Sequence, residues 1–150
     1  MKAVKWFGPR DVRLVELDKP VPKPQEVLVR VASTGICGSD IHYYVDGRIG
    51  HTRIQSPLIL GHEYAGIVEA VGAEADPGYV GKRVAVEPGI PCLRCEWCQK
   101  GHYNVCPELR FPGGPPHDGA LAEYIAVHAS FCFPLPDSMT LTEAAIIEPL

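Results

Sequence analysis

The sequence predicts a mainly β domain with short helices, and three observations lead to that prediction. Short segments rich in β-branched and aromatic residues recur along the 150-residue chain, as in KAVKWF at residues 2–7 and EVLVRVAS at residues 26–33. The 15 glycines and 15 prolines fall between such segments and do not form one low-complexity block. Hydrophobic residues make up 46% of the chain, which suffices for one packed core, so we expect a single domain.

The first part of the chain is expected to form strands at residues 2–7, 12–17 and 26–33. Three prolines between residues 20 and 24 predict an extended connector before the third of these strands. A short helical turn is predicted over residues 38–44, and it leads into a turn at Asp46-Gly47.

The second part is expected to complete the body of a small barrel. Strands are predicted at residues 61–71, 81–87, 122–127 and 130–133, with a turn at residues 76–78 between the first two. Thr140 and Glu143 form a capping-box pattern that predicts a helix over residues 141–147, which Pro149 ends.

Charge and hydropathy exclude several classes of function. The 14 basic and 18 acidic residues give a net charge of −4, and no basic run suggests binding to nucleic acid or to an anionic membrane surface. The N-terminus lacks the apolar segment of a secretory signal, and no apolar run is long enough to cross a bilayer. These features predict a cytoplasmic protein, in which cysteines stay reduced.

Four of the six cysteines are close together in the sequence, at positions 92, 95, 98 and 106. This spacing lets local sequence enclose one tetrahedral ion with four thiolates, and it predicts a structural zinc site with no open position for a substrate. An iron–sulfur cluster is the alternative, because C-x2-C-x2-C followed later by Cys-Pro is similar to ferredoxin spacing. Zinc is favoured because the last interval is longer than in that pattern. Cys132, between Phe131 and Phe133, is expected to be a small buried hydrophobe.

Two further stretches, TGICGSDIH and LGHEYAG, carry Cys37 and the pair His62-Glu63 beside glycines. A lone cysteine is usually a core residue, and a His-Glu pair is usually a hydrogen-bonded surface couple. The spacing of these residues therefore leaves a second metal site open as an alternative and does not decide it.

Several motifs together resemble the zinc-containing medium-chain dehydrogenases in order and spacing, over essentially the whole chain. They are GICGSDIH, HYYVDGRIG, PLILGHEYAGIVEAVG, GKRVAVEPG, the four-cysteine segment and IIEPL. HYYVDGRIG and IIEPL are most similar to the sorbitol and xylitol dehydrogenase branch. The resemblance implies that residues 1–150 form a GroES-like β-barrel with a zinc-stabilised lobe, acting as a catalytic domain.

The resemblance also implies a catalytic zinc held by Cys37 and His62, with Glu63 as an adjacent ligand, directly or through water. Glu148 stands where the alcohol-dehydrogenase branch has a third cysteine, and it is expected to meet the metal or to hold its water. The structural zinc is implied at Cys92, Cys95, Cys98 and Cys106.

Other residues are assigned roles around the reacting oxygen by the same resemblance. Ser39 is the expected hydrogen-bond partner of that oxygen, and His42 matches a proton-relay position. Asp40 is expected to brace the turn or the His62 imidazole. Candidates for lining a sugar-alcohol pocket are Tyr43, Phe111 and Arg53, with Ser39 and Glu148 also facing the substrate.

The implied reaction oxidises a secondary alcohol to a ketone with hydride transfer to NAD or NADP. No G-x-G-x-x-G motif follows a strand in these residues, so the resemblance implies a separate Rossmann domain for the cofactor. The 150 residues alone are then expected to bind zinc without turnover, and the full enzyme is expected to be a homo-oligomer. Two alternatives stay open: a threonine-type or other alcohol dehydrogenase, and a non-catalytic zinc-binding module.

Overall fold

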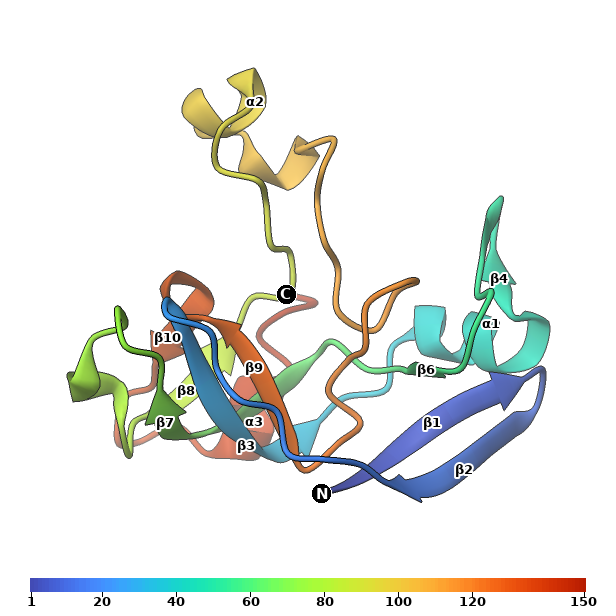
Figure 1. Ribbon diagram of the computed structural model, residues 1–150, viewed down its shortest axis with the longest axis horizontal. Helices are drawn as coiled ribbons and strands as arrows, with labels where there is room; N and C mark the ends of the chain where they lie inside the picture. The colour runs from blue at the N-terminus through green and yellow to red at the C-terminus, as the bar shows by residue number, and fades with distance from the viewer.

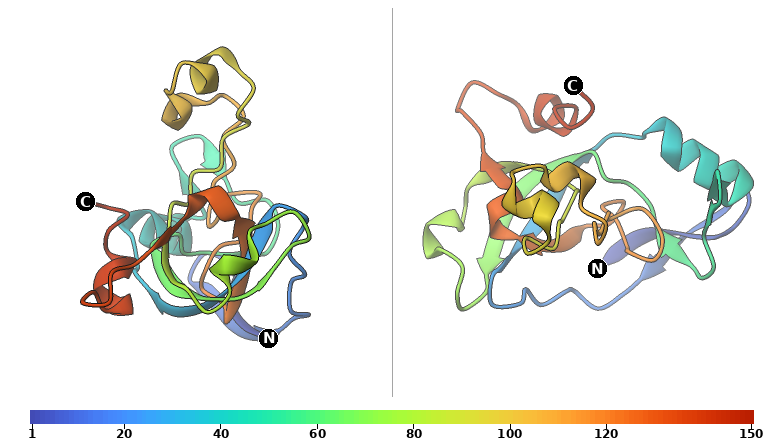
Figure 2. Two further views of the ribbon diagram at one scale, coloured as in Figure 1. Left: turned by 90° about the vertical axis from the view of Figure 1, so that its left-hand side faces the viewer. Right: turned by 90° about the horizontal axis from the view of Figure 1, so that it is seen from above.

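The computed structural model describes all 150 residues and confirms a mainly β architecture with three short α-helices. The strands form three antiparallel sheets, and residues near the middle of the chain project away from them as a separate lobe (Figure 1). The left view of Figure 2 again shows this lobe standing clear of the strands, joined to them by two lengths of chain. None of the helices has the length and hydrophobicity that a membrane crossing requires.

A three-stranded sheet is built around the N-terminal strand. Strand β1 (Lys2–Gly8) pairs with β2 (Asp11–Glu16) on one side and with β6 (Leu58–Ile59) on the other. The backbone N–H of Val4 donates to the carbonyl of Leu121 at 2.8 Å, so this sheet is tied to the segment before β9. The early strands at residues 2–7 and 12–17 are thus confirmed, each within one residue at either end.

The five-stranded sheet carries the main core. Its order is β10-β8-β7-β3-β9, and its strands are β3 (Glu26–Thr34), β7 (Tyr64–Val71), β8 (Arg83–Val86), β9 (Tyr124–His128) and β10 (Cys132–Pro134). Alternate side chains of these strands point inward, and Val27, Val29, Val68 and Val84 are almost wholly buried. Burying each such side chain contributes on the order of 1.5–3 kcal/mol, so this sheet supplies most of the hydrophobic stabilisation.

The barrel expected from the sequence is present as curled sheets without one continuous closed ladder. The two edge strands of the five-stranded sheet, β9 and β10, do not pair with each other. The chain connects them through the 3-10 turn Ala129–Phe131. The ladder between β3 and β7 also shifts register twice, which bends both strands around the core.

Three α-helices and two short strands complete the fold. Helix α1 (Gly38–Asp46) ends at Gly47, whose φ of 65° is the left-handed conformation typical of a helix C-terminus. The hairpin of β4 (Arg48–Ile49) and β5 (Thr52–Arg53) follows it directly.

The other two helices are short and separate from α1. Helix α2 (Glu96–Gln99) lies within the projecting lobe. Helix α3 (Leu141–Ala145) packs Ala144 and Ala145 onto Ala65 and Ala85 of the five-stranded sheet.

The capping box predicted at α3 is confirmed. The Thr140 hydroxyl accepts from the Glu143 backbone N–H at 3.2 Å, and the Glu143 carboxylate accepts from the Thr140 N–H at 2.8 Å. The helix itself ends at Ala145 and not at residue 147 as predicted.

Several sequence predictions of local structure were wrong in extent. The strand predicted from residue 61 begins only at Tyr64, because Gly61 has a φ of 89° that no strand residue adopts. The strand predicted at residues 130–133 starts as a 3-10 turn and becomes β10 at Cys132. Strands β4, β5 and β6 and helix α2 were not predicted, because elements of two to four residues have no readable periodicity.

Candidate metal centres

Two groups of side chains in the structure have the composition and spacing of metal ligands. One consists of Cys37, His62 and Glu63, whose ligand atoms all lie within 4.8 Å of one another. The other consists of Cys92, Cys95, Cys98 and Cys106, whose sulfur atoms meet the same limit. The first is called the open cluster below, and the second the four-cysteine cluster.

The open cluster forms where two paired strands meet their loops. At one end of the β3–β7 ladder, Thr34 is opposite Tyr64, so the chain just after β3 lies beside the chain just before β7. The backbone N–H of Gly35 continues that pairing by donating to the Glu63 carbonyl at 2.7 Å. Cys37 is the N-cap residue of α1, two positions farther on. Strand pairing therefore brings it to His62, which comes 25 positions later in the chain, and to Glu63.

A glycine is needed at position 35 for Glu63 to occupy its place. A Cβ atom built on Gly35 would overlap the Glu63 carboxylate oxygen Oε2 and come within 3.0 Å of its Cβ. The Glu63 side chain is 7% exposed, and it lies directly over the Gly35 backbone. A larger residue at position 35 would therefore push this carboxylate out of the open cluster.

Asp40 holds the two halves of the open cluster together. Its Oδ2 accepts from the Cys37 backbone N–H at 3.0 Å, and its Oδ1 accepts from the Gly61 backbone N–H at 3.0 Å. Asp40 is only 3% exposed, and its Oδ1 also lies 3.9 Å from His62 Nδ1. The sequence offered two roles for Asp40, and the structure places it to brace both the turn and the histidine segment.

The buried imidazole of His62 has a ring nitrogen without a hydrogen-bond partner in the protein. Its Nδ1 is shielded from solvent and has no hydrogen-bond partner, because 3.9 Å to Asp40 Oδ1 is beyond hydrogen-bonding distance. One face of the ring packs on Phe111, with the ring centroids 4.9 Å apart. A buried polar ring beside a thiol and a carboxylate, with unused bonding capacity, is the environment that a metal ion would complete.

Residues of α1 expected around the reacting oxygen lie at different depths. Ser39 is half-buried in the first turn, one residue from Asp40, whereas His42 is exposed to solvent. Tyr43 is buried against Trp6 and Leu58, and this burial raises the pKa of its hydroxyl. The structure thus gives Tyr43 a packing role in addition to the pocket-lining role expected of it.

Glu148 is not one of the three side chains in the open cluster, although two of them, His62 and Glu63, are close enough to affect its pKa. Removal from water raises the pKa of its carboxyl; His62 opposes this effect, whereas Glu63 and Glu87 add to it. Glu148 lines a cavity of about 520 Å³ together with Glu87, Tyr103 and Ile147. A ligand role for Glu148 remains a prediction.

The residues Glu87 and Tyr103 were missed by the sequence reasoning. Tyr103 comes from the projecting lobe, and its hydroxyl donates to Glu87 Oε2 at 3.3 Å. The nearby Glu87 carboxylate raises the pKa of Tyr103. The stretch GKRVAVEPG contains Glu87, but nothing in the sequence indicated that it would share a cavity with Glu148.

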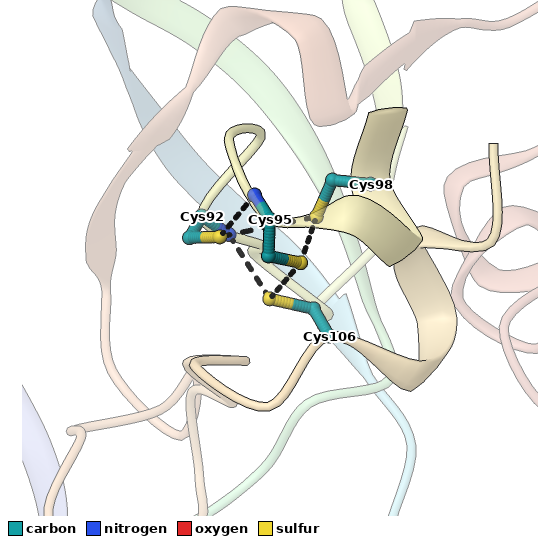
Figure 3. Close-up of side chains that lie close together, drawn as sticks. All are labelled: Cys92, Cys95, Cys98 and Cys106. Atoms are coloured by element: carbon teal, nitrogen blue, oxygen red, sulfur yellow. Dashed lines mark hydrogen bonds between the residues drawn. The ribbon is translucent and has the colours of Figure 1, made fainter. Parts of the chain in front are cut away.

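The four-cysteine cluster has the size of a single-ion site (Figure 3). Its sulfur–sulfur separations include 3.4 Å for Cys95–Cys98, 3.9 Å for Cys95–Cys106 and 4.0 Å for Cys92–Cys98. Four sulfurs at about 2.3 Å from a tetrahedral zinc ion would stand about 3.8 Å apart. The same separations are far longer than a disulfide bond of about 2.05 Å, and all six cysteines are free.

Thiol acidity differs sharply within the four-cysteine cluster. The pKa of Cys92 falls to about 7, chiefly because the backbone N–H of Arg94 stabilises its thiolate. The pKa of Cys98 rises to about 12, chiefly through desolvation and then through Cys95. The backbone N–H of Cys92 also donates to Cys106 Sγ at 3.3 Å, so the loop already directs donors at its sulfurs.

The remaining predicted residues lie outside both clusters. Cys132 is buried in the main core, as predicted, and burial raises the pKa of its thiol to about 12. Arg53 is exposed on β5 and lines a separate polar cavity with Pro115 and Pro116. The structure therefore does not bring Arg53 to the open cluster.

Comparison with known proteins places this architecture in a family. The family model described as the alcohol dehydrogenase GroES-like domain matches residues 23–137, most of the chain. The chain belongs to the alcohol dehydrogenase GroES-like domain family. The matched range includes the open cluster and the four-cysteine cluster, so the family assignment covers both candidate metal centres.

Three similar proteins illustrate this GroES-like family. Sorbitol dehydrogenase of Bacillus subtilis (strain 168) is 49% identical over 149 residues, which are 99% of this chain and 42% of that protein. Galactitol-1-phosphate dehydrogenase from Escherichia coli superimposes with a TM-score of 0.90 at 37% identity, over 99% of this chain and 42% of that one. A short-chain alcohol dehydrogenase from E. coli CFT073, complexed with NADH, gives a TM-score of 0.90 at 36% identity, with the same coverage. The chain thus spans less than half the length of these relatives.

Proposed function

We propose that this chain is the zinc-binding catalytic domain of a zinc-dependent polyol dehydrogenase, which oxidises a secondary alcohol to a ketone with NAD or NADP. The observation that carries the proposal is the open cluster, in which a thiol, an imidazole and a carboxylate from separated segments come within 4.8 Å of one another. The similarity to sorbitol dehydrogenase supports a polyol as substrate. The length of the relatives supports a nicotinamide-binding domain outside residues 1–150.

The donor set of the open cluster suits zinc. Zinc binds thiolate, imidazole nitrogen and carboxylate oxygen at about 2.0–2.3 Å, and a site with three protein ligands keeps a position for substrate. The unpartnered Nδ1 of buried His62 supports the fit, since an imidazole in this setting has capacity for a further partner. Cys37 and His62 would hold the ion, with Glu63 as the adjacent ligand. A zinc ion bound there would supply Lewis-acid polarisation of a hydroxyl oxygen.

The protein residues around the open cluster would orient the alcohol and carry its proton away. Ser39, half-buried in the first turn of α1, would accept a hydrogen bond from the substrate hydroxyl. His42 is exposed on the same helix and has an imidazole suited to passing a proton to solvent. Phe111 packs on His62 and would exclude water from one side of the imidazole. Glu148, whose pKa is raised by desolvation, would hold a proton or a water molecule at the edge of the adjoining cavity.

The four-cysteine cluster has a different role in this proposal. Four thiolates at single-ion separations complete a tetrahedral shell and leave no place for substrate. Zinc at Cys92, Cys95, Cys98 and Cys106 would therefore fix the projecting lobe, which has almost no apolar core of its own. These separations also favour one ion over an iron–sulfur cluster, which would need to fit several metal atoms between the sulfurs.

The first experiment counts metal ions in variants of the two clusters. We expect two zinc ions per chain in the wild type and one in each of Cys37→Ser and Cys92→Ser, with two retained in the core control Cys132→Ser. Two zinc ions in Cys37→Ser would contradict the open site. A brown protein containing iron would contradict the zinc assignment of the four-cysteine cluster.

The second experiment tests the reaction in the complete protein that carries this domain. We expect sorbitol- or xylitol-dependent reduction of NAD or NADP, lost at least 100-fold in Cys37→Ser and retained in Cys132→Ser. Activity on threonine with none on polyols would reassign the substrate class. Two bound zinc ions without turnover on any alcohol would leave a non-catalytic zinc module as the function.

Cellular setting and assembly complete the proposal. Six free cysteines, four of them poised as metal ligands, fit a reducing compartment such as the cytoplasm. Exposed apolar residues around α3 and β10, including Phe133 and Ile146, suit burial by a further domain or by another copy in a homo-oligomer. Sedimentation of the complete protein as a monomer would exclude the oligomer.

A further inference from the structure

A polar cavity lies apart from both metal centres, between the β4–β5 hairpin region and the turn at Pro115-Pro116. It has a volume of about 420 Å³, and its polar lining consists of His51, Thr52, Arg53, Gln55 and Ser56. We call it the 51–56 pocket. Its volume falls in the range of about 300–1,000 Å³ that is common for small-molecule sites.

The lining of the 51–56 pocket is cationic and rich in hydrogen-bond donors. It contains a guanidinium group, an imidazole, two hydroxyls and an amide, but no carboxylate. Residues 48–58, RIGHTRIQSPL, hold no Asp or Glu, although the whole chain has 18 acidic residues and a net charge of −4. The lining residues themselves therefore favour an anionic ligand over a cation.

The hairpin beside the pocket carries two arginines directly across from each other. In the β4–β5 ladder Arg48 pairs with Arg53, and like charges at opposed positions are destabilising. Acids neutralise two other exposed arginines, Arg13 through Asp11 and Arg94 through Glu108. Arg10, Arg30 and Arg110 are exposed without an ion pair, but none of them is opposite another arginine in a strand ladder.

Neither hairpin arginine belongs to an ion pair in the structure. The recorded hydrogen bond of the Arg48 guanidinium is a long one, 3.4 Å to the Gly50 carbonyl. An anion bound to Arg53 in the pocket would offset part of the repulsion between the two guanidinium groups.

We propose that the 51–56 pocket binds a phosphate group. A guanidinium group can donate two parallel hydrogen bonds to phosphate oxygens, and the hydroxyls of Thr52 and Ser56 and the imidazole of His51 can serve the remaining oxygens. A carboxylate offers only two oxygens and would leave more of these donors without partners. The proposal does not depend on zinc or on the proposed reaction, because the pocket shares no residue with either metal cluster.

Two sources of the phosphate group are chemically possible, namely inorganic phosphate and the phosphate ester of a sugar alcohol. The position of the pocket gives the ester a physical basis. Leu58 lines the pocket and packs on Tyr43, while Pro115 lies four positions after Phe111, whose ring contacts His62. The pocket is therefore linked, through Leu58 and the segment that follows Phe111, to residues near the open cluster.

The test is calorimetric titration of the purified protein at constant ionic strength with inorganic phosphate, sorbitol 6-phosphate and sorbitol. We expect Arg53→Gln to weaken phosphate binding at least tenfold and Arg53→Lys to weaken it less. Arg13→Gln is the matched control, because it removes the same charge from another exposed strand position. It should bind phosphate as the wild type does. Urea denaturation should show that Arg53→Gln is no less stable than wild type, since it removes the repulsion with Arg48.

Each outcome of this titration decides the proposal. Tighter binding of sorbitol 6-phosphate than of inorganic phosphate, dependent on Arg53, would support the proposal and identify a phosphate ester as the ligand. If sorbitol 6-phosphate and inorganic phosphate bind equally tightly and both depend on Arg53, the proposal is supported and inorganic phosphate is the ligand. Absence of phosphate binding, or equal weakening by Arg53→Gln and Arg13→Gln, would overturn it. None of these readouts involves turnover or metal content, so the result stays separate from the test of the proposed reaction.

Discussion

Replacing Asp40 with alanine removes the side chain that joins the two ligand-bearing segments of the open cluster. The Asp40 carboxylate accepts from the backbone N–H groups of Cys37 and Gly61, each at 3.0 Å, and it is only 3% exposed. In Asp40→Ala both N–H groups lose this acceptor, and the Gly61 N–H in particular lies in a buried setting. Each hydrogen bond to a charged group contributes about 1.5–3 kcal/mol, so the two together contribute about 3–6 kcal/mol.

The expected loss lies toward the lower end of that range. Removing the carboxylate also removes the cost of burying it, which offsets part of the loss. We therefore expect Asp40→Ala to lower the free energy of unfolding by about 3 kcal/mol. Asp40→Asn keeps one carbonyl oxygen as an acceptor and should lose less, about 1.5 kcal/mol.

Guanidinium chloride denaturation followed by tryptophan fluorescence measures these changes, with Asp46→Ala as the matched control. Asp46 is the last residue of the same helix, and it is exposed. Its replacement should change the free energy of unfolding by less than about 0.5 kcal/mol. Equal stabilities of Asp40→Ala and Asp46→Ala would refute the role given to Asp40. Zinc retention at the open cluster should weaken about 10–100-fold in Asp40→Ala, as for other residues that orient metal ligands.

Three further predictions concern the core and the cysteines. Val68→Ala should lower the free energy of unfolding by about 2–3 kcal/mol, since two buried carbons at about 0.8 kcal/mol each are lost and a cavity remains. The control Val12→Ala, at a position 43% exposed, should lower it far less. Equal denaturation midpoints for these two variants would contradict the core position of Val68. Zinc affinity at the four-cysteine cluster should rise with pH between 6 and 8, because zinc binding must displace protons from the thiols. Cys98, with a pKa of about 12, is protonated throughout this range, and Cys92, with a pKa of about 7, is protonated in part of the molecules. The affinity is measured by competition with a chelator; an affinity that does not change with pH, once the chelator's own pH dependence is subtracted, would contradict this. Cys132→Ser should lower stability by about 1–3 kcal/mol, because it places a hydroxyl in an apolar core, yet leave the zinc content unchanged; a lower zinc content would make Cys132 a ligand.

The sequence was most informative where one local pattern decides the structure. The buried strand at residues 26–33 and the capping box at Thr140 were predicted nearly as observed, because periodicity and capping depend on residues close together in the chain. The four cysteines were equally clear, because their spacing alone brings four sulfurs around one point. In each case the interaction spans few residues, and the sequence displays it directly.

Long-range features required the folded chain. The approach of Cys37 to His62 depends on the register of β3 against β7, which the two segments do not encode separately. The contact of Phe111 with His62 likewise joins residues 49 positions apart. Only the strand register reveals that Arg48 and Arg53 face each other. The resemblance to a known family suggested the first of these relationships but gave no indication of the last.

The central claim is that one zinc ion is shared by Cys37 and His62, and anomalous diffraction at the zinc absorption edge tests it most directly. In crystals of the zinc-loaded protein we expect two anomalous peaks per chain. One should lie about 2.3 Å from Cys37 Sγ and about 2.1 Å from a ring nitrogen of His62, and the other among the four cysteines. A single peak confined to the four cysteines, at full zinc loading, would contradict the account.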